Sequence, residues 1–154
     1  MLYLGVNNAK RVHYRLKPSF REGVRMPIVV PVNQGIDEAL TSAIELAQRR
    51  DHKLIALLHR PLHEYDQDFV DQEIDALTDQ LDAADIAFSI EVRVGEKDLA
   101  THISELVTKE KADLVVVSLA RKPVNGKLLL GSQIQKLLVE CPCSVLVVRE
   151  KVNV

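Results

Sequence analysis

The sequence contains no tryptophan, and only three tyrosines and three phenylalanines occur among its 154 residues. Proteins that bind single-stranded nucleic acid without sequence preference stack the bases on aromatic side chains. This chain has little material for such a stacking surface, and it carries no recognised nucleic-acid-binding motif. We therefore do not expect nucleic acid to be its partner.

Cysteine is also scarce, since Cys141 and Cys143 of a Cys-Pro-Cys segment are the two cysteines of the sequence. Two are too few for the disulfide framework of a small secreted domain, and the Cys-x-x-Cys spacing of thiol redox sites is absent. We interpret them as small apolar residues that lead into a buried strand. No apolar run reaches the length of a membrane span, and residues 1–25 lack the apolar stretch of a signal peptide, so we expect a cytoplasmic protein with no membrane partner.

The charge is unevenly distributed, although the net charge is only −2. Residues 1–25 carry six basic residues and one acidic residue, a net of +5, which leaves −7 for the rest of the chain. A basic arm can bind an anionic partner, or it can lie against its own acidic domain or that of a neighbouring subunit. We favour the second interpretation.

Within the arm, apolar and basic residues alternate as they do in a strand. Val12, Tyr14 and Leu16 lie between basic residues, and Asn7 and Asn8 suit a tight turn. This pattern predicts a β-hairpin at 1–17, and the alternative is a disordered leader. We divide the chain into an arm, 1–25, and one domain, 26–154.

From Pro27 onward, short β-branched runs alternate with helical periodicity. Continuous apolar runs, typical of strands buried on both faces, occur at 27–32, 53–58, 113–117 and 145–148. Apolar residues at helical spacing follow within 36–47, 70–84, 99–107 and the segment that begins at 132. This alternation predicts an α/β fold, a parallel sheet with helices on both faces. Because Ser132 and Gln135 match a capping box, we expect the last helix to be capped by Ser132.

Two strands are expected at the edges of this sheet. In 88–94, apolar residues alternate with Ser89, Glu91 and Arg93, which indicates a strand with one face in water or only partly covered. The last strand is apolar on both faces, and an apolar unpaired edge invites association. We therefore predict a homodimer through Val145–Val148, with arm exchange between subunits as an open alternative.

Three stretches together resemble the universal stress protein family and cover nearly all of residues 26–149. They are Ile28-Val-Val-Pro-Val-Asn33, Leu57-Leu58-His59, and the C-terminal half with Ala112–Ser118, Leu128–Ser132 and Cys141–Arg149. The resemblance implies a Rossmann-like (adenine nucleotide alpha hydrolase-like) sheet of five parallel strands in the order 3-2-1-4-5. It also implies homodimers and, in many members, ATP or another adenine nucleotide at the carboxyl ends of the strands. Such ligands bind at the topological switch point, here between the first and fourth strands.

The phosphate motif of nucleotide-binding members is Gly, two residues, Gly, nine residues, then Gly-Ser or Gly-Thr. Counted back from Gly131-Ser132, the two earlier glycine positions hold Ser118 and Arg121. The aspartate that follows the first strand in the family is replaced by Asn33, and the valine that faces adenine is replaced by Arg60. By resemblance, the candidate ligand site comprises Pro31, Asn33, Arg60, Gly95, Ser118, Arg121, Gly131 and Ser132.

These departures decide our functional prediction. Side chains at 118 and 121 would fill space that phosphates need, because glycines let the backbone approach phosphate closely. We predict a dimeric stress-response regulatory or protective module, not an enzyme, that does not bind ATP in the usual mode. The alternative is an adenine-nucleotide-binding protein or weak nucleotide hydrolase, with Arg60 and Arg121 contacting the anion. Ser118 has no assigned base, and Pro61 argues against a helical metal site at His59 and His63, so we expect no catalytic residue and no metal.

Overall fold

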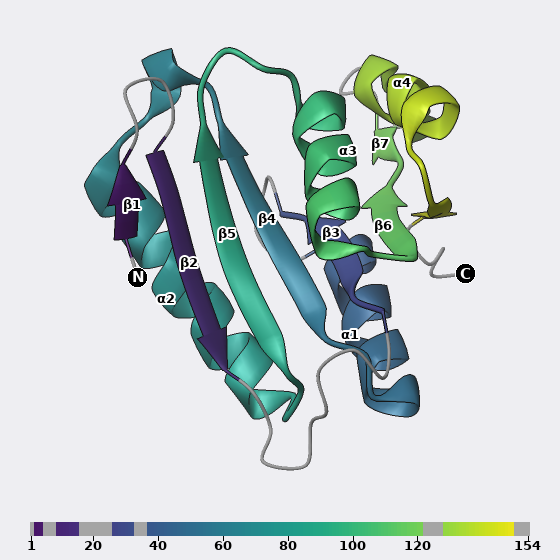
Figure 1. Ribbon diagram of the computed structural model, residues 1–154, viewed down its shortest axis with the longest axis horizontal. Coiled ribbons are helices and arrows are strands. Elements are labelled where there is room, and N and C mark those ends of the chain that lie inside the picture. Colours follow the sequence, from purple (N-terminus) through teal and green to yellow (C-terminus); the bar gives the residue numbers. More distant parts are fainter. Residues whose placement is uncertain (1, 5–8, 16–25, 33–36, 122–127, 150–154) are drawn as a thin grey trace.

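The computed structural model describes residues 2–4, 9–15, 26–32, 37–121 and 128–149, and it shows one open sheet with helices packed against it (Figure 1). The sheet has seven strands in the order β1-β2-β5-β4-β3-β6-β9, and β7 pairs with β8 separately. The strands are β1 (Leu2–Leu4), β2 (Ala9–Arg15), β3 (Ile28–Pro31), β4 (Leu54–Arg60), β5 (Phe88–Val94), β6 (Leu114–Ser118), β7 (Ala120–Arg121), β8 (Leu128–Leu129) and β9 (Ser144–Val148). The helices are α1 (Glu38–Arg50), a 3₁₀ turn η1 (Leu62–Glu64), α2 (Gln67–Ala83), α3 (Leu99–Glu110) and α4 (Ser132–Glu140).

The five strands β5-β4-β3-β6-β9 are all parallel to their neighbours. In chain order within the domain this arrangement is 3-2-1-4-5, so the predicted Rossmann-like fold is confirmed. The order reverses between β3 and β6, which places the switch point where we expected it.

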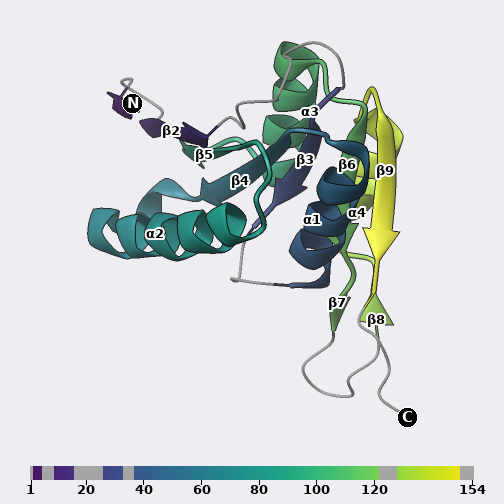
Figure 2. The ribbon, with the colours of Figure 1, turned by 90° about the horizontal axis from the view of Figure 1, so that it is seen from below.

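Two apolar cores lie on opposite faces of the sheet, and Figure 2 shows the two helical layers. Helices α1 and α2 cover one face, with Leu40 and Ile74 in that core, whereas α3 and α4 cover the other, with Ile103 and Leu137. Successive residues of β3 point to alternate cores, because strand side chains alternate between faces. This two-sided burial explains the continuous apolar runs in the sequence. No helix among the described residues is long and apolar enough to cross a membrane.

Aspartates start the three longest helices. The carboxylates of Asp37, Asp66 and Asp98 accept hydrogen bonds from backbone amides in the first turns of α1, α2 and α3. These bonds satisfy amides that have no partner within the helix. At the other end, α1 and α3 stop at Asp51 and Lys111, which adopt the left-handed conformation with φ of 57° and 55°.

The N-terminal arm extends the sheet. Strands β1 and β2 form an antiparallel hairpin, and β2 pairs antiparallel with β5 through a register that joins Lys10 to Arg93 and Arg15 to Phe88. The predicted hairpin is therefore present between residues 2 and 15. The prediction that 88–94 forms a sheet edge is wrong, because β2 covers that edge.

The polar face of β5 is buried as well, contrary to our interpretation of its alternation. Glu91 is only 3% exposed, and its carboxylate lies 3.4 Å from the Arg93 guanidinium and 3.8 Å from the Lys109 ammonium of α3. A carboxylate can be buried at acceptable cost when it is paired with opposite charge. The alternation thus reflects a buried ion-pair network and not a solvated face.

Candidate functional site

The carboxyl ends of the parallel strands bring several predicted site residues to one edge of the sheet. Pro31 ends β3, Arg60 ends β4 and Ser118 ends β6, while Gly95 directly follows β5. The Gly95 amide donates to the carbonyl of Arg60 at 3.4 Å, which joins two of these ends. Asn33 lies outside the described residues, and Arg121 is placed only by its backbone in β7.

Ser118 lies at the switch point, and its side chain is already bonded. Its hydroxyl oxygen accepts a hydrogen bond of 3.0 Å from the amide of Ala39, in the first turn of α1. The next amides of α1, those of Leu40 and Thr41, donate to the side chain and the carbonyl of Asp37. The N-terminus of α1 is therefore satisfied by the protein itself, and it offers none of these amides to an anion.

The side chain of Arg60 is directed toward α2. Its guanidinium forms an ion pair with Glu73 and donates to the carbonyl of His59 at 2.8 Å. Both members of the ion pair are largely buried. Because Glu73 neutralises this guanidinium, Arg60 does not present a free positive charge to a ligand.

The N-terminus of α4 differs from our prediction. Gly131 is the N-cap, with φ −63° and ψ 159°, and a glycine has no side chain that could cap the helix. The predicted capping box is wrong because Ser132 is the first helical residue, and the Gln135 side chain donates instead to the carbonyl of Leu130 at 2.8 Å. A Cβ at Gly131 would meet no described atom within 4 Å, so none of the described residues fills the space beside this helix end.

Side chains of α4 tie its first turns to the start of α3. Gln133 accepts a hydrogen bond of 3.1 Å from the amide of Ala100, and the Lys136 ammonium lies 2.6 Å from the carboxylate of Asp98. The hydrogen bond from Lys136, with those from Thr101, lowers the pKa of Asp98 well below its usual range. Two of the helices that flank the candidate site are thus held together by polar contacts.

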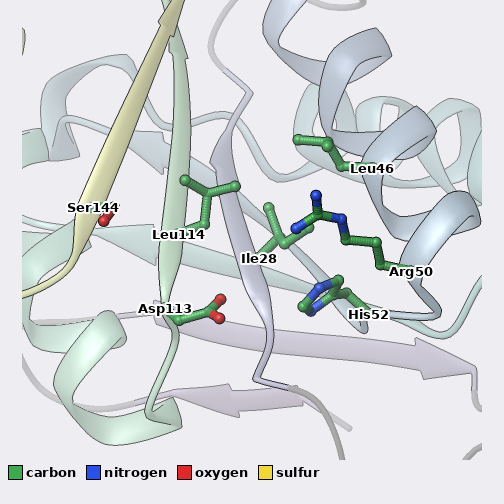
Figure 3. A pocket seen from close by; sticks show the side chains of 7 residues that line it. All are labelled: Ile28, Leu46, Arg50, His52, Asp113, Leu114 and Ser144. Carbon is green, nitrogen blue, oxygen red and sulfur yellow. The ribbon is translucent and has the colours of Figure 1, made fainter.

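A cavity lies at the opposite end of the sheet from the candidate site. A cavity of about 220 Å³ is located at the amino ends of β3, β6 and β9 (Figure 3), lined by Ile28, Leu46, Arg50, His52, Asp113, Leu114 and Ser144. The ring of His52 donates to the carbonyl of Met26 at 2.6 Å. Sequence analysis did not single out these residues, because three separate strand starts and one helix end meet there only in the fold.

A buried histidine of α3, His102, was also not identified from the sequence. His102 is 0% exposed, neither ring nitrogen has a hydrogen-bond partner, and its ring centroid lies 4.9 Å from that of His59 in β4. Burial, assisted by the neighbouring His59 and Arg93, which disfavour the protonated form, lowers the pKa of His102 to about 4. Within the described residues, no group of three or more His, Cys, Asp or Glu side chains could hold a metal ion.

The fold and the position of the candidate site define a class of protein. A parallel sheet of five strands with helices on both faces, and with polar residues at the switch point, defines a Rossmann-like α/β protein. The model of the Universal stress protein family matches residues 25–149. The chain therefore belongs to the universal stress protein family.

Individual relatives agree with this assignment. A universal stress protein of Mycolicibacterium smegmatis is 33% identical over 113 residues, which cover 72% of this chain and 86% of that protein. The structure of a universal stress protein from Archaeoglobus fulgidus, 21% identical, superimposes with a TM-score of 0.69 over 80% of this chain and 98% of that one. A universal stress protein structure from the same organism in complex with dAMP is 17% identical, with a TM-score of 0.63 over 80% and 98% of the two chains. A universal stress protein in complex with cAMP is 26% identical, with a TM-score of 0.60 over 80% and 96% of the two chains.

Proposed function

We propose that this universal stress protein is a non-enzymatic, stress-response regulatory or protective module that does not bind ATP in the usual mode of its family. The hydrogen bond between the Ser118 hydroxyl and the Ala39 amide is the main support. The Ser118 side chain, held by this bond, occupies the switch point. A glycine there would leave the backbone accessible to phosphate. Neutralisation of Arg60 by Glu73 supports the same proposal, because it removes a cation that could have compensated. We also keep the prediction of a cytoplasmic location, on the scarcity of cysteine.

An adenine nucleotide bound in another way is the second candidate function. The related structures contain dAMP and cAMP, which carry one phosphate group each. The N-terminus of α4, whose N-cap is a glycine, and the space at Gly131 that no described residue fills leave room there for a single phosphate. This candidate needs neither a glycine at 118 nor a free Arg60.

Ligand-dependent stability separates the two candidates. We expect no change in the melting temperature with ATP, whereas a bound ligand at 100 times its dissociation constant adds about 2.7 kcal/mol to the free energy of unfolding. The double variant Ser118→Gly, Arg121→Gly is expected to gain stabilisation by ATP, because it restores the two glycines of the motif. The measurement is thermal unfolding followed by circular dichroism, with ATP, dAMP and cAMP in parallel.

Ser144→Gly is the matched control, since it makes the same replacement at the opposite end of the sheet. It should leave the response to every nucleotide unchanged. Stabilisation of the unaltered protein by ATP would contradict the proposal. Stabilisation by dAMP or cAMP without ATP would favour the second candidate.

We further propose that the protein forms a homodimer through β9. Among the described strands β9 has a neighbour on one side only, and Leu146 at its centre is 39% exposed. Leu138 and Val139 of the adjacent helix α4 are also exposed. An edge strand with four consecutive apolar residues, Val145–Val148, favours pairing with a second copy, which would cover both the free backbone groups and the apolar side chains.

A charge placed on this edge should dissociate the dimer. We expect sedimentation equilibrium to give twice the chain mass of 17.3 kDa for the unaltered protein and the monomer mass for Leu146→Lys, because a lysine at a paired edge is desolvated and repelled by its copy. Phe69→Lys on α2, where the phenylalanine is 58% exposed, is the matched control and should remain dimeric. An interface at β9 would be refuted if the unaltered protein were a monomer. It would also be refuted if the Phe69 variant were monomeric while the Leu146 variant remained dimeric.

A further inference from the structure

The two cysteines form a close pair of thiols on the α3 and α4 side of the sheet. Cys141 is the C-cap of α4 and Cys143 immediately precedes β9, with Pro142 between them. Their sulfur atoms are 3.7 Å apart, and both side chains are free thiols and partly exposed. The pair is separate from the candidate ligand site, because it lies at the amino end of β9 whereas the candidate site lies at the carboxyl ends of the strands.

The surrounding structure holds the two thiols in this arrangement. The amide of Cys141 donates to the carbonyl of Leu137 at 2.8 Å, and the Cys143 thiol donates weakly to the carbonyl of Ser144 at 3.5 Å. Both cysteines also pack against the core under α3 and α4. The ring of Pro142 fixes the backbone angle between them, so the spacing of the sulfur atoms is preorganised by the fold.

The spacing fits chelation of one metal ion. A metal–thiolate bond is about 2.3 Å long, so two thiolates on one ion are separated by about 3.8 Å at a tetrahedral angle and by about 4.0 Å at a trigonal angle. The observed 3.7 Å lies within a few tenths of an ångström of both values, including the trigonal one. By contrast, sulfur atoms in a disulfide are about 2.05 Å apart, so forming one would require both side chains to move much further.

We propose that Cys141 and Cys143 together bind one soft, monovalent cation of the Cu⁺ type. Soft thiolate ligands select such ions. An ion with a low coordination number suits this site, in which the two thiolates and one small solute molecule would be its ligands. Binding converts two thiols into two thiolates, so one Cu⁺ enters, two protons leave and the complex carries a net charge of −1. Zn²⁺ requires four ligands in a closed site, and the described residues supply no third His, Cys, Asp or Glu here.

The environment of Cys143 disfavours a free thiolate. Burial first, then the hydrogen bond with Cys141 and the nearby negative charge of Asp113, raises the pKa of Cys143 to about 12. Without a metal, this cysteine therefore stays protonated and poorly reactive at neutral pH. Because a metal must displace these protons, its affinity should rise with pH.

Anaerobic titration of the full chain with Cu⁺, in competition with a chromophoric chelator, tests the site. We expect one equivalent of Cu⁺ to bind and about two protons to be released per ion. Cys141→Ser and Cys143→Ser should each weaken binding by at least about 100-fold, because one thiolate cannot chelate. Pro142→Gly keeps both thiols but loosens their spacing, and it should weaken binding by about 10-fold.

Ser144→Ala is the matched control next to the pair and should bind Cu⁺ like the unaltered protein, and circular dichroism establishes that each variant is folded. Unchanged affinity in either cysteine variant would overturn the proposal, since it would place the ion elsewhere. Binding of Zn²⁺ as tight as that of Cu⁺ would also overturn it. So would a thiol assay that finds the pair oxidised to a disulfide in reducing buffer. None of these results depends on whether the protein binds nucleotides.

Discussion

Replacing Ile103 by alanine is expected to lower the free energy of unfolding by about 2–5 kcal/mol. Ile103 is 1% exposed and lies in the middle of α3, in the core that this helix shares with β3, β4 and β6. The substitution removes three carbon atoms from a close-packed region, so the loss combines the transfer free energy of those atoms with the cost of the cavity left behind. Urea unfolding followed by circular dichroism measures the change, because the chain has no tryptophan for fluorescence.

Leu62→Ala provides the matched control for this prediction. Leucine and isoleucine have the same number of atoms, but Leu62 is 60% exposed, in the 3₁₀ turn before α2. Its truncation should change the free energy of unfolding by no more than about 0.5 kcal/mol. Equal effects of the two substitutions would mean that α3 does not pack on the sheet as described.

The apolar patterning of the sequence was sufficient to predict the parallel part of the fold. Strands such as 27–32 and 113–117 are apolar on both faces because helices cover both, and this composition is visible without a structure. The helical stripe that contains Ile103 likewise marked the buried side of α3. The strand order itself came from the family resemblance, because strand composition does not specify which strands are neighbours.

The position of β5 could not be predicted in the same way. Glu91 and Arg93 alternate with apolar residues, and such alternation commonly marks a solvated face. Glu91 is buried beside Lys109 of α3, 18 residues further along the chain, and β2 pairs with β5 along the edge that was expected to be open. Partners of this kind are brought together only by tertiary structure.

The candidate site shows the same limit. Spacing from Gly131 identified Ser118 as a departure from the family motif, but it could not show that the Ser118 hydroxyl bonds to the amide of Ala39, 79 residues away. The ion pair of Arg60 with Glu73 was equally inaccessible, because it joins a strand end to the following helix. Sequence therefore indicated which positions are unusual, whereas the contacts show what those side chains do instead of binding phosphate.

Acidification is expected to destabilise the protein through His102. In the unfolded chain this imidazole titrates with a pKa near 6.5, whereas burial lowers its pKa to about 4 in the folded protein. Well above pH 6.5 the ring is neutral in both states, so its protonation does not affect the stability. As the pH falls below 6.5 only the unfolded state gains the proton, so stability decreases until about pH 4, where the folded state is also protonated. The total loss corresponds to about 3 kcal/mol.

The groups around His102 strengthen this expectation. His59, Arg93 and Lys97 disfavour a further positive charge, and Glu105 alone among the named neighbours favours it. The carboxylates of Asp98 and Glu105 have lowered pKa values, so their own stabilising contributions are lost only at more acidic pH. Between pH 7 and 5 these two carboxylates therefore contribute little, and we expect His102 to account for a loss of about 2 kcal/mol in that range.

A pair of variants assigns the effect to this side chain. His102→Phe keeps a ring at this buried position without a titratable group, so its free energy of unfolding should vary much less between pH 7 and 5. His63→Gln removes a solvent-exposed histidine of η1 and should leave the pH dependence of the unaltered protein intact. Urea unfolding at each pH provides the measurement. If the Phe variant loses stability as steeply as the unaltered protein, another group must be responsible, and the buried imidazole is not the acid-sensitive element of this fold.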